Sequence, residues 1–125
     1  LKQRMERFAY EICGAKNIAL TLQLDKLETK DLTMEQRKNM YLIFKEAVNN
    51  VAKYSRCSKC SIHISLHQHR LLLDIHDNGI GFDVNKADSG NGLSNMHKRA
   101  EAMKGRVSIQ SIPGEGTQVT LNMPV

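Results

Sequence analysis

Two neighbouring stretches of the chain alternate apolar and polar residues, and this pattern limits the possible folds more than any other feature. The apolar positions are Cys60, Ile62, Ile64 and Leu66 in the first stretch, then Leu71, Leu73 and Ile75 in the second. Alternation with period two is typical of a strand that buries one face. The polar break at 68–70 predicts a hairpin, whose apolar face must be covered by another layer of structure.

Helical periodicity precedes this hairpin. Apolar residues recur at helical spacing over 1–13 and Gly14 follows, which predicts a first helix that ends on a left-handed glycine. A capping box formed by Thr33 and Gln36 predicts the start of a longer helix, which extends to about Tyr54. Both helices are candidates to cover the apolar face of the hairpin.

Further strands and a third helix complete the predicted order of elements. Alternation over 18–24 predicts a strand before the long helix, and alternation over 107–109 and 119–123 predicts two strands at the end. Helical spacing over 93–103 predicts a third helix, which ends at Gly105. This order predicts an α+β fold, a two-layer α/β sandwich in which helices cover one face of a mixed sheet.

Length and composition restrict the class of protein. The 125 residues predict one domain, 1–125. The net charge of +5 favours anionic partners such as a phosphate-rich ligand, but Lys and Arg are scattered, so direct nucleic-acid binding is not expected. Three cysteines predict a reducing compartment, and the sequence lacks the apolar run of about 20 residues that a membrane helix needs. Because it starts at Leu1 rather than Met, we interpret the chain as a cytoplasmic part of something longer.

A candidate binding site follows the hairpin. Asp77 continues the inward parity of the second strand, so its carboxylate lies at the end of a core-facing row, where a charge is costly. This position is justified if Asp77 accepts hydrogen bonds from an entering donor, such as an exocyclic amino group, while Gly79 and Gly81 let backbone approach a flat ligand. The alternative is a turn capped by Asp77. A calcium loop fits less well, because the two glycines stand where oxygen ligands are required.

The long helix carries a polar ridge that consists of Glu46, Asn50 and Lys53. Their spacing places them where the apolar and polar faces of the helix meet, so a carboxylate, an amide and an ammonium are predicted to project toward one spot. An exposed ladder of i,i+4 pairs is the alternative. Against it, Asn50 lies at the edge of the core-facing arc, where an amide needs a partner.

A glycine pair, Gly90 and Gly92, opens the third helix. The backbone amides and the positive end of that helix suit an anion. The segment is neither a Walker loop, since no Gly-Lys-Ser/Thr follows, nor a dinucleotide fingerprint, since no parallel βαβ unit surrounds it. Alone, this pair is weak evidence for a ligand.

Four motifs occur together in the order Glu46-x-x-x-Asn50, Asp77-x-Gly79-x-Gly81, Gly90-x-Gly92-Leu93 and Gly116-Thr117. In combination they resemble the N box and the glycine boxes of the ATP-binding domain of bacterial sensor histidine kinases, and the resemblance covers nearly the whole chain. The segments 92–99 and 113–117 look most like the subgroup with short lids, which includes nitrate-sensing and lipid-sensing kinases. The resemblance implies the Bergerat-type ATP-binding fold.

The same resemblance implies roles for the site residues. Asn50 would hold Mg²⁺ at the phosphates of ATP, Glu46 would orient or deprotonate the attacking group, and Asp77 would accept the adenine amino group. The other residues implied to bind nucleotide are Lys53 and Tyr54 at the phosphates, Gly79, Gly81 and Thr117 at the base, and Gly90, Gly92 and Leu93 at the lid. Members of the family commonly carry an aromatic motif in a longer lid, and only Phe82 stands near that place here.

The resemblance also implies partners. The γ-phosphoryl group would pass to a His on the dimerisation domain of the same parent and then to a response regulator, and the parent would be a homodimer anchored in the inner membrane. His76-Asp77 matches the His-Asp pair of the acceptor motif only superficially, because it ends a strand. An anti-sigma-factor-like serine kinase or binding module of the same superfamily is the alternative.

A zinc site is a further possibility that the sequence raises. Cys57, Cys60 and His63 have the residue types and the close spacing of zinc ligands. However, Cys60 and His63 have opposite parity in the predicted strand, and Cys60 stands on its apolar register. Core packing of Cys60 is therefore predicted instead.

Overall fold

The computed structural model describes residues 1–25, 32–83 and 93–125. Its elements, in chain order, are α1 (Lys2–Ala15), β1 (Ala19–Leu24), α2 (Met34–Asn50), a π-helical turn η2 (Val51–Ser55), β2 (Lys59–His67), β3 (Arg70–Asp77), α3 (Leu93–Ala102), β4 (Arg106–Ile112) and β5 (Gly116–Pro124). The predicted order of helices and strands is confirmed. None of the helices in the described ranges is long and apolar enough to cross a membrane.

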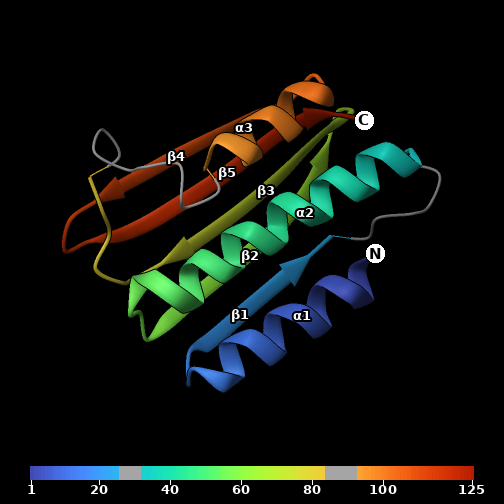
Figure 1. Cartoon of the computed structure of the whole chain (residues 1–125). Helices are drawn as coiled ribbons and strands as arrows, with labels where there is room; N and C mark the ends of the chain where they lie inside the picture. Colours follow the sequence, from blue (N-terminus) through green and yellow to red (C-terminus); the bar gives the residue numbers. More distant parts are fainter. Residues whose placement is uncertain (26–31, 84–92) are drawn as a thin grey trace.

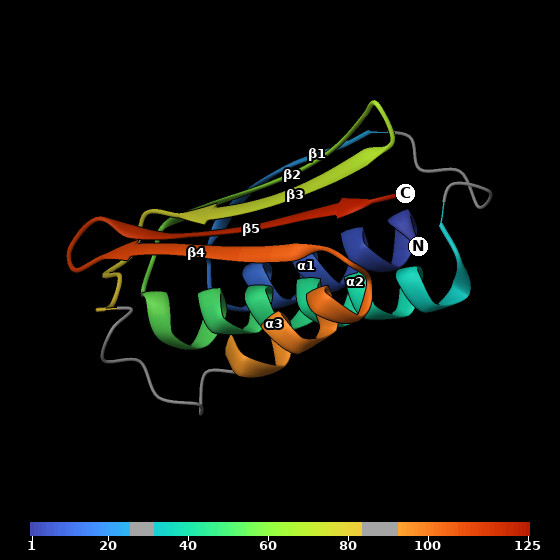
Figure 2. The same ribbon diagram turned by 90° about the horizontal axis from the view of Figure 1, so that it is seen from above.

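The strands form one mixed sheet in the order β1-β2-β3-β5-β4. β1 pairs with β2 in parallel, and the other three pairs are antiparallel. All three helices lie on the same face of this sheet, which Figure 2 shows edge-on and Figure 1 shows with its strand labels. The predicted α+β sandwich of two layers is therefore confirmed.

The hydrophobic core lies between the helices and this face of the sheet. The residues of β2 and β3 that alternation predicted to face inward are buried there, namely Cys60, Ile62, Ile64, Leu71, Leu73 and Ile75. On α2, Ile43, Phe44 and Val48 close the core from the other layer. Burial of this apolar surface is the main force that holds the two layers together.

The start of α2 confirms the predicted capping box. The backbone N–H of Gln36 donates to Oγ1 of Thr33 at 3.0 Å, and the backbone N–H of Thr33 donates to Oε1 of Gln36 at 2.8 Å. Two backbone donors that have no partner within the helix are thereby satisfied.

The ends of α1 and α3 differ from the prediction that glycines close them. Asn17 and Lys104 adopt the left-handed conformation, with φ of 57° and 58°, whereas Gly14 and Gly105 are not among the residues with positive φ. Gly105 is needed for a different reason, because a Cβ at this position would clash with Asn122 and Met123 of β5. Asn tolerates the left-handed region, but for Lys the tertiary structure must hold it.

Replacement of Gly14 by Ala is expected to stabilise the protein. Gly14 lies inside α1, and no atom would come within 4 Å of an added Cβ. Since Ala favours the helix over Gly, the free energy of unfolding should rise by about 0.5 kcal/mol. Urea unfolding measures this change. Gly105→Ala is the matched comparison and should destabilise, and equal effects of the two substitutions would contradict the geometry.

Candidate functional site

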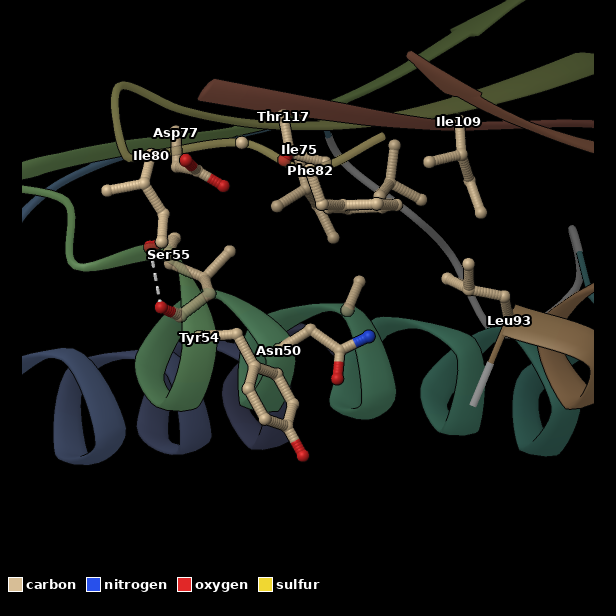
Figure 3. Close-up of a pocket in the computed structure, with 14 residues that line it drawn as sticks. Asn50, Tyr54, Ser55, Ile75, Asp77, Ile80, Phe82, Leu93, Ile109 and Thr117 are labelled. Atoms are coloured by element: carbon tan, nitrogen blue, oxygen red, sulfur yellow. Dashed lines mark hydrogen bonds between the residues drawn. The ribbon is translucent and has the colours of Figure 1, made fainter. Parts of the chain in front are cut away.

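A cavity of about 320 Å³ opens between α2 with its π-helical turn and the ends of β3, β4 and β5 (Figure 3). Its walls are mostly apolar and include Ile75, Ile80, Ile109 and Val119. Three of these residues belong to strands and face the helix layer because they share the parity of the core. The volume lies near the lower end of the roughly 300–1,000 Å³ that is usual for small-molecule sites.

Asp77 is the buried acid of this cavity. Its side chain is 3% exposed, and in the sheet it stands directly opposite Cys60 on one side and Thr117 on the other. The backbone N–H of Gly79 donates to Oδ1 at 2.8 Å, and the backbone of Thr117 is also hydrogen-bonded to the carboxylate. Burial raises the pKa of Asp77 above its ordinary value, and these two hydrogen bonds only partly oppose the shift. The predicted burial of this carboxylate is confirmed.

Gly79 lies against the π-helical turn rather than in the cavity wall. A Cβ at Gly79 would clash with the backbone carbonyl of Ser55, and the same carbonyl accepts a hydrogen bond from the N–H of Ile80 at 2.7 Å. Gly81 does line the cavity, with φ of +65°, and a Cβ there would clash with the carbonyl of Ile112. Both glycines therefore shape the cavity by allowing two backbone segments to meet.

The end of α2 departs from regular α-helical geometry where it borders the cavity. The helix widens into the π-helical turn at 51–55, and Oγ of Ser55 donates to the carbonyl of Val51 at 2.7 Å. Tyr54 and Ser55 of this turn line the cavity beside Asn50 (Figure 3). π-Helical turns inside α-helices occur frequently at functional sites.

The polar ridge of α2 does not converge on one spot as predicted. Asn50 lines the cavity, whereas Glu46 lines a second, more polar hollow of about 230 Å³ between α2 and α3. Lys53 is exposed and is not among the residues that line the cavity. The packing of α3 against α2 creates the second hollow, which helical spacing within α2 alone does not reveal.

The start of α3 carries one of the residues that the resemblance assigned to the lid, Leu93. Gly90 and Gly92 lie outside the described residues. Leu93, the first residue of α3, lines the cavity at the side away from Asp77 (Figure 3). Of the predicted site residues, the structure thus brings together Asn50, Tyr54, Asp77, Gly81, Leu93 and Thr117.

Sequence reasoning did not assign Phe82, Ile109 or Ser111 to the site. Phe82 and Ile109 line the cavity, and the N–H of Phe82 donates to Oγ of Ser111 at 2.8 Å. The alternation of β4 predicted that Ile109 faces inward, and the same parity applies to Ser111. That these residues meet the segment after β3 depends on the pairing of β4 with β5, which is a tertiary feature.

The cysteines do not form a zinc site in the part of the chain that the structure describes. Cys60 is buried and His63 is exposed on the opposite face of β2, as their parity predicted. The thiol of Cys60 is hydrogen-bonded to that of Cys13, and this bond together with burial raises the pKa of Cys60. Among residues 1–25, 32–83 and 93–125, no group of three or more His, Cys, Asp or Glu side chains could hold a metal ion.

The chemistry of the cavity suits a flat ligand that carries an amino group. Branched aliphatic side chains and Phe82 offer apolar surface to such a ligand, and the carboxylate of Asp77 offers an acceptor at the side away from Leu93 (Figure 3). A donor from the ligand would offset the cost of the buried charge. Asn50 offers an amide on the opposite, helical side (Figure 3).

Comparison with known protein families agrees with this chemistry. Residues 35–125, well over half of the chain, match the family described as histidine kinase-, DNA gyrase B- and HSP90-like ATPases. The chain belongs to this ATPase family. The match begins at the second residue of α2 and so includes every residue that lines the cavity.

Two sequence relatives are a sensor histidine kinase and a sensor protein. The sensor histidine kinase LiaS of Bacillus subtilis is 31% identical over 88 residues, which cover 70% of this chain and 24% of LiaS. The sensor protein VraS of Staphylococcus saprophyticus is 34% identical over 88 residues, which cover 70% of this chain and 25% of VraS. The chain thus spans about a quarter of the length of the curated relatives it matches.

Solved structures confirm the fold of the family. A blue-light activated histidine kinase of Erythrobacter litoralis superimposes with a TM-score of 0.81. The superposition covers 96% of this chain and 40% of the other, at 18% sequence identity. At this identity the likeness shows the architecture alone.

Proposed function

We propose that this chain is the catalytic, ATP-binding domain of a sensor histidine kinase. In this proposal it binds Mg-ATP and transfers the γ-phosphoryl group to a His on a dimerisation domain of the same parent protein. The observation that carries the proposal is the buried carboxylate of Asp77 in an apolar cavity of suitable size, within a chain whose sequence relatives are sensor kinases. A buried carboxylate among apolar side chains can accept a hydrogen bond from the amino group of adenine.

The part of the cavity beside Asp77 is proposed to hold the base. Asp77 accepts the exocyclic amino group, Ile80 and Phe82 supply apolar surface beside the ring, and Thr117 supports the polar edge. Gly79 and Gly81 act by allowing the backbone of the loop to pack against Ser55 and Ile112. In this arrangement the binding energy for the base comes from apolar burial, and its orientation comes from the hydrogen bond to Asp77.

The helical side of the cavity is proposed to face the phosphates. The amide oxygen of Asn50, which lines the cavity, is a hard oxygen ligand of the kind that suits Mg²⁺. Few protein ligands are needed for this ion, because Mg²⁺ retains several waters and binds the phosphates of the substrate. Bound Mg²⁺ would neutralise charge on the phosphates during transfer. Tyr54 and Lys53 lie on the π-helical turn next to Asn50 and are assigned to the phosphates, and Gly90, Gly92 and Leu93 to the lid.

Glu46 is proposed to act on the attacking group. Its carboxylate lines the polar hollow beside the cavity, together with Lys45 and Arg99. A carboxylate in this position can orient an incoming imidazole or take its proton.

The proposal implies partners beyond this chain. The acceptor His belongs to the dimerisation domain of a homodimeric parent, which then passes the phosphoryl group to a response regulator. We assign 1–125 to one catalytic domain that acts in the cytoplasm, with the parent anchored in the inner membrane. The anti-sigma-factor-like alternative has no support from the named relatives, which are sensor kinases.

Calorimetric titration with ATP, with and without Mg²⁺, tests the proposed site. The protein should bind ATP more tightly with Mg²⁺, and Asn50→Ala should lose most of this difference. Even residues that merely support metal ligands typically contribute 10–100-fold to metal affinity, so we expect a loss of at least roughly 10-fold. Asn122→Ala, on the exposed face of β5, is the matched control and should behave as the unchanged protein. Failure to bind millimolar ATP would refute the nucleotide site.

A further inference from the structure

Three polar side chains lie in one row across the sheet at the side of the cavity that is formed by β3 and β5. Asp77 of β3 stands opposite Thr117 of β5, and Thr117 stands opposite Ser111 of β4. Asp77 and Thr117 line the cavity, while Ser111 lies behind Thr117 as a half-buried residue with no place in the cavity wall. Ser111 can therefore influence a ligand only through Thr117 or through the loop that follows β3.

The hydroxyl of Ser111 has three neighbours within hydrogen-bond distance. The backbone N–H of Phe82 donates to Oγ of Ser111 at 2.8 Å. Oγ1 of Thr117 lies 2.8 Å from the same oxygen, and the carbonyl of Gly116 lies 3.2 Å from it. One side chain thus connects the loop after Asp77, the first residue of β5 and the cavity residue Thr117.

The protons available at these groups select one set of directions that satisfies all three contacts. A Ser hydroxyl has one proton to donate and two lone pairs that accept. The N–H of Phe82 uses one lone pair of Ser111, and the carbonyl of Gly116 can only accept the proton of Ser111. All three contacts are hydrogen bonds only if Thr117 donates its own proton to the second lone pair of Ser111. In that arrangement Thr117 presents no donor to the cavity, only lone pairs.

We propose that Ser111 is a positioning residue that determines which purine the cavity accepts, an inference that rests on the proposed function. By accepting the hydrogen bond of Thr117, Ser111 leaves the Thr117 hydroxyl only lone pairs to offer the cavity, so that Thr117 becomes an acceptor beside the carboxylate of Asp77. Two acceptors side by side match an amino group, which has two protons to donate. The same two acceptors disfavour binding of a purine that carries an oxygen at this ring position, because the lone pairs of that oxygen would face the lone pairs of Thr117.

The test compares ATP with inosine triphosphate, which carries an oxygen in place of the amino group. The unchanged protein should prefer ATP. In Ser111→Ala the hydroxyl of Thr117 can rotate and donate a hydrogen bond into the cavity. The ratio of the affinities for ATP and inosine triphosphate should then fall about 10-fold, which is the usual effect when one ligand gains a hydrogen bond that the other loses. Ser111→Thr keeps a hydroxyl and should keep the preference.

Two further variants separate positioning from a general structural role. Thr117→Val removes the hydroxyl that Ser111 positions, so this variant alone should lower the preference for ATP over inosine triphosphate. The double variant with Ser111→Ala should show the same preference as Thr117→Val. Ser108→Ala, on the same strand but on the exposed face of the sheet, should leave both affinities unchanged. The Thr117→Val result does not depend on whether Ser111→Ala folds.

The outcomes are distinct. An equal loss of affinity for both nucleotides in Ser111→Ala, or an unchanged ratio in Thr117→Val, overturns the inference and leaves the proposed function intact. Absence of binding of either nucleotide to the unchanged protein overturns the proposed function and the inference together. A ratio that falls in Ser111→Ala, is restored in Ser111→Thr and does not fall further in the double variant supports it.

Discussion

Replacement of Asp77 by Asn is expected to lower the affinity for ATP about 100-fold and, in the absence of nucleotide, to stabilise the protein. A hydrogen bond to a charged group contributes roughly 1.5–3 kcal/mol, and the amide would also place a donor opposite the donor of the ligand. The free protein benefits because the substitution removes a carboxylate that is 3% exposed. Opposite effects on stability and binding are typical of a residue kept for function.

The stabilisation by Asp77→Asn should depend on pH in a defined direction. Burial raises the pKa of Asp77, so the folded protein holds this proton at pH values where the unfolded chain has released it. The contribution of protonated Asp77 to the free energy of unfolding is fully present below the ordinary pKa of Asp. It is lost as the pH rises through the raised pKa of Asp77 in the folded protein. The two proteins should therefore have nearly equal stability in strong acid, and the advantage of Asn should grow as the pH rises and then level off.

Thermal unfolding over a range of pH and calorimetric titration with ATP measure the two effects of Asp77→Asn. Asp74→Asn is the matched control, because Asp74 lies on the same strand but faces away from the cavity, where Gln118 and Thr120 donate to it. It should leave ATP affinity unchanged. ATP affinity that survives Asp77→Asn, or lower stability of this variant near neutral pH, would contradict the role given to the buried acid.

Replacement of Gly116 by Ala is expected to cost about 4 kcal/mol or more of the free energy of unfolding. Gly116 has φ of +97°, and an added Cβ would clash with the backbone carbonyl of Asp77 on the neighbouring strand. Left-handed strain alone accounts for about 1–2 kcal/mol, and relief of the clash requires β3 and β5 to separate. Because whole domains have stabilities of about 5–15 kcal/mol, much of the population should unfold.

Gly114→Ala separates the two causes of this loss. Gly114 lies in the turn just before β5 with φ of +85°, but no atom would come within 4 Å of its added Cβ. It should cost only the backbone strain, about 1–2 kcal/mol. Urea unfolding of both variants measures the difference, and equal costs would show that the approach of β5 to Asp77 is less tight than the structure indicates.

Periodicity along the chain correctly predicted the order of helices and strands and the burial of Asp77. The inward parity of Leu71, Leu73 and Ile75 predicted the burial of Asp77, and the structure confirms it. The capping box of Thr33 and Gln36 was also read correctly, because it depends only on residues within one turn of helix. Such features are local, so the amino-acid order determines them directly.

Helix ends and the polar ridge were predicted less well. Because glycine adopts the left-handed conformation most easily, Gly14 and Gly105 were predicted to end their helices in it. Instead Asn17 and Lys104 have positive φ, at the points where the chain turns toward β1 and β4. Helical spacing also grouped Glu46 with Asn50, whereas α3 packs beside α2 and places Glu46 in its own hollow. Both errors arise where a neighbouring element overrides a local preference.

The sequence by itself determined the two layers, the face that each strand buries and the presence of a costly acid beside a glycine-rich loop. The tertiary structure alone decided which backbones meet at that loop: Gly79 packs on Ser55, Gly81 on Ile112, and Ser111 joins Phe82 to Thr117. The physical reason is the range of the interactions. Side-chain periodicity is set by the geometry of one helix or strand, whereas these contacts join segments far apart in sequence and exist only once the strands have paired.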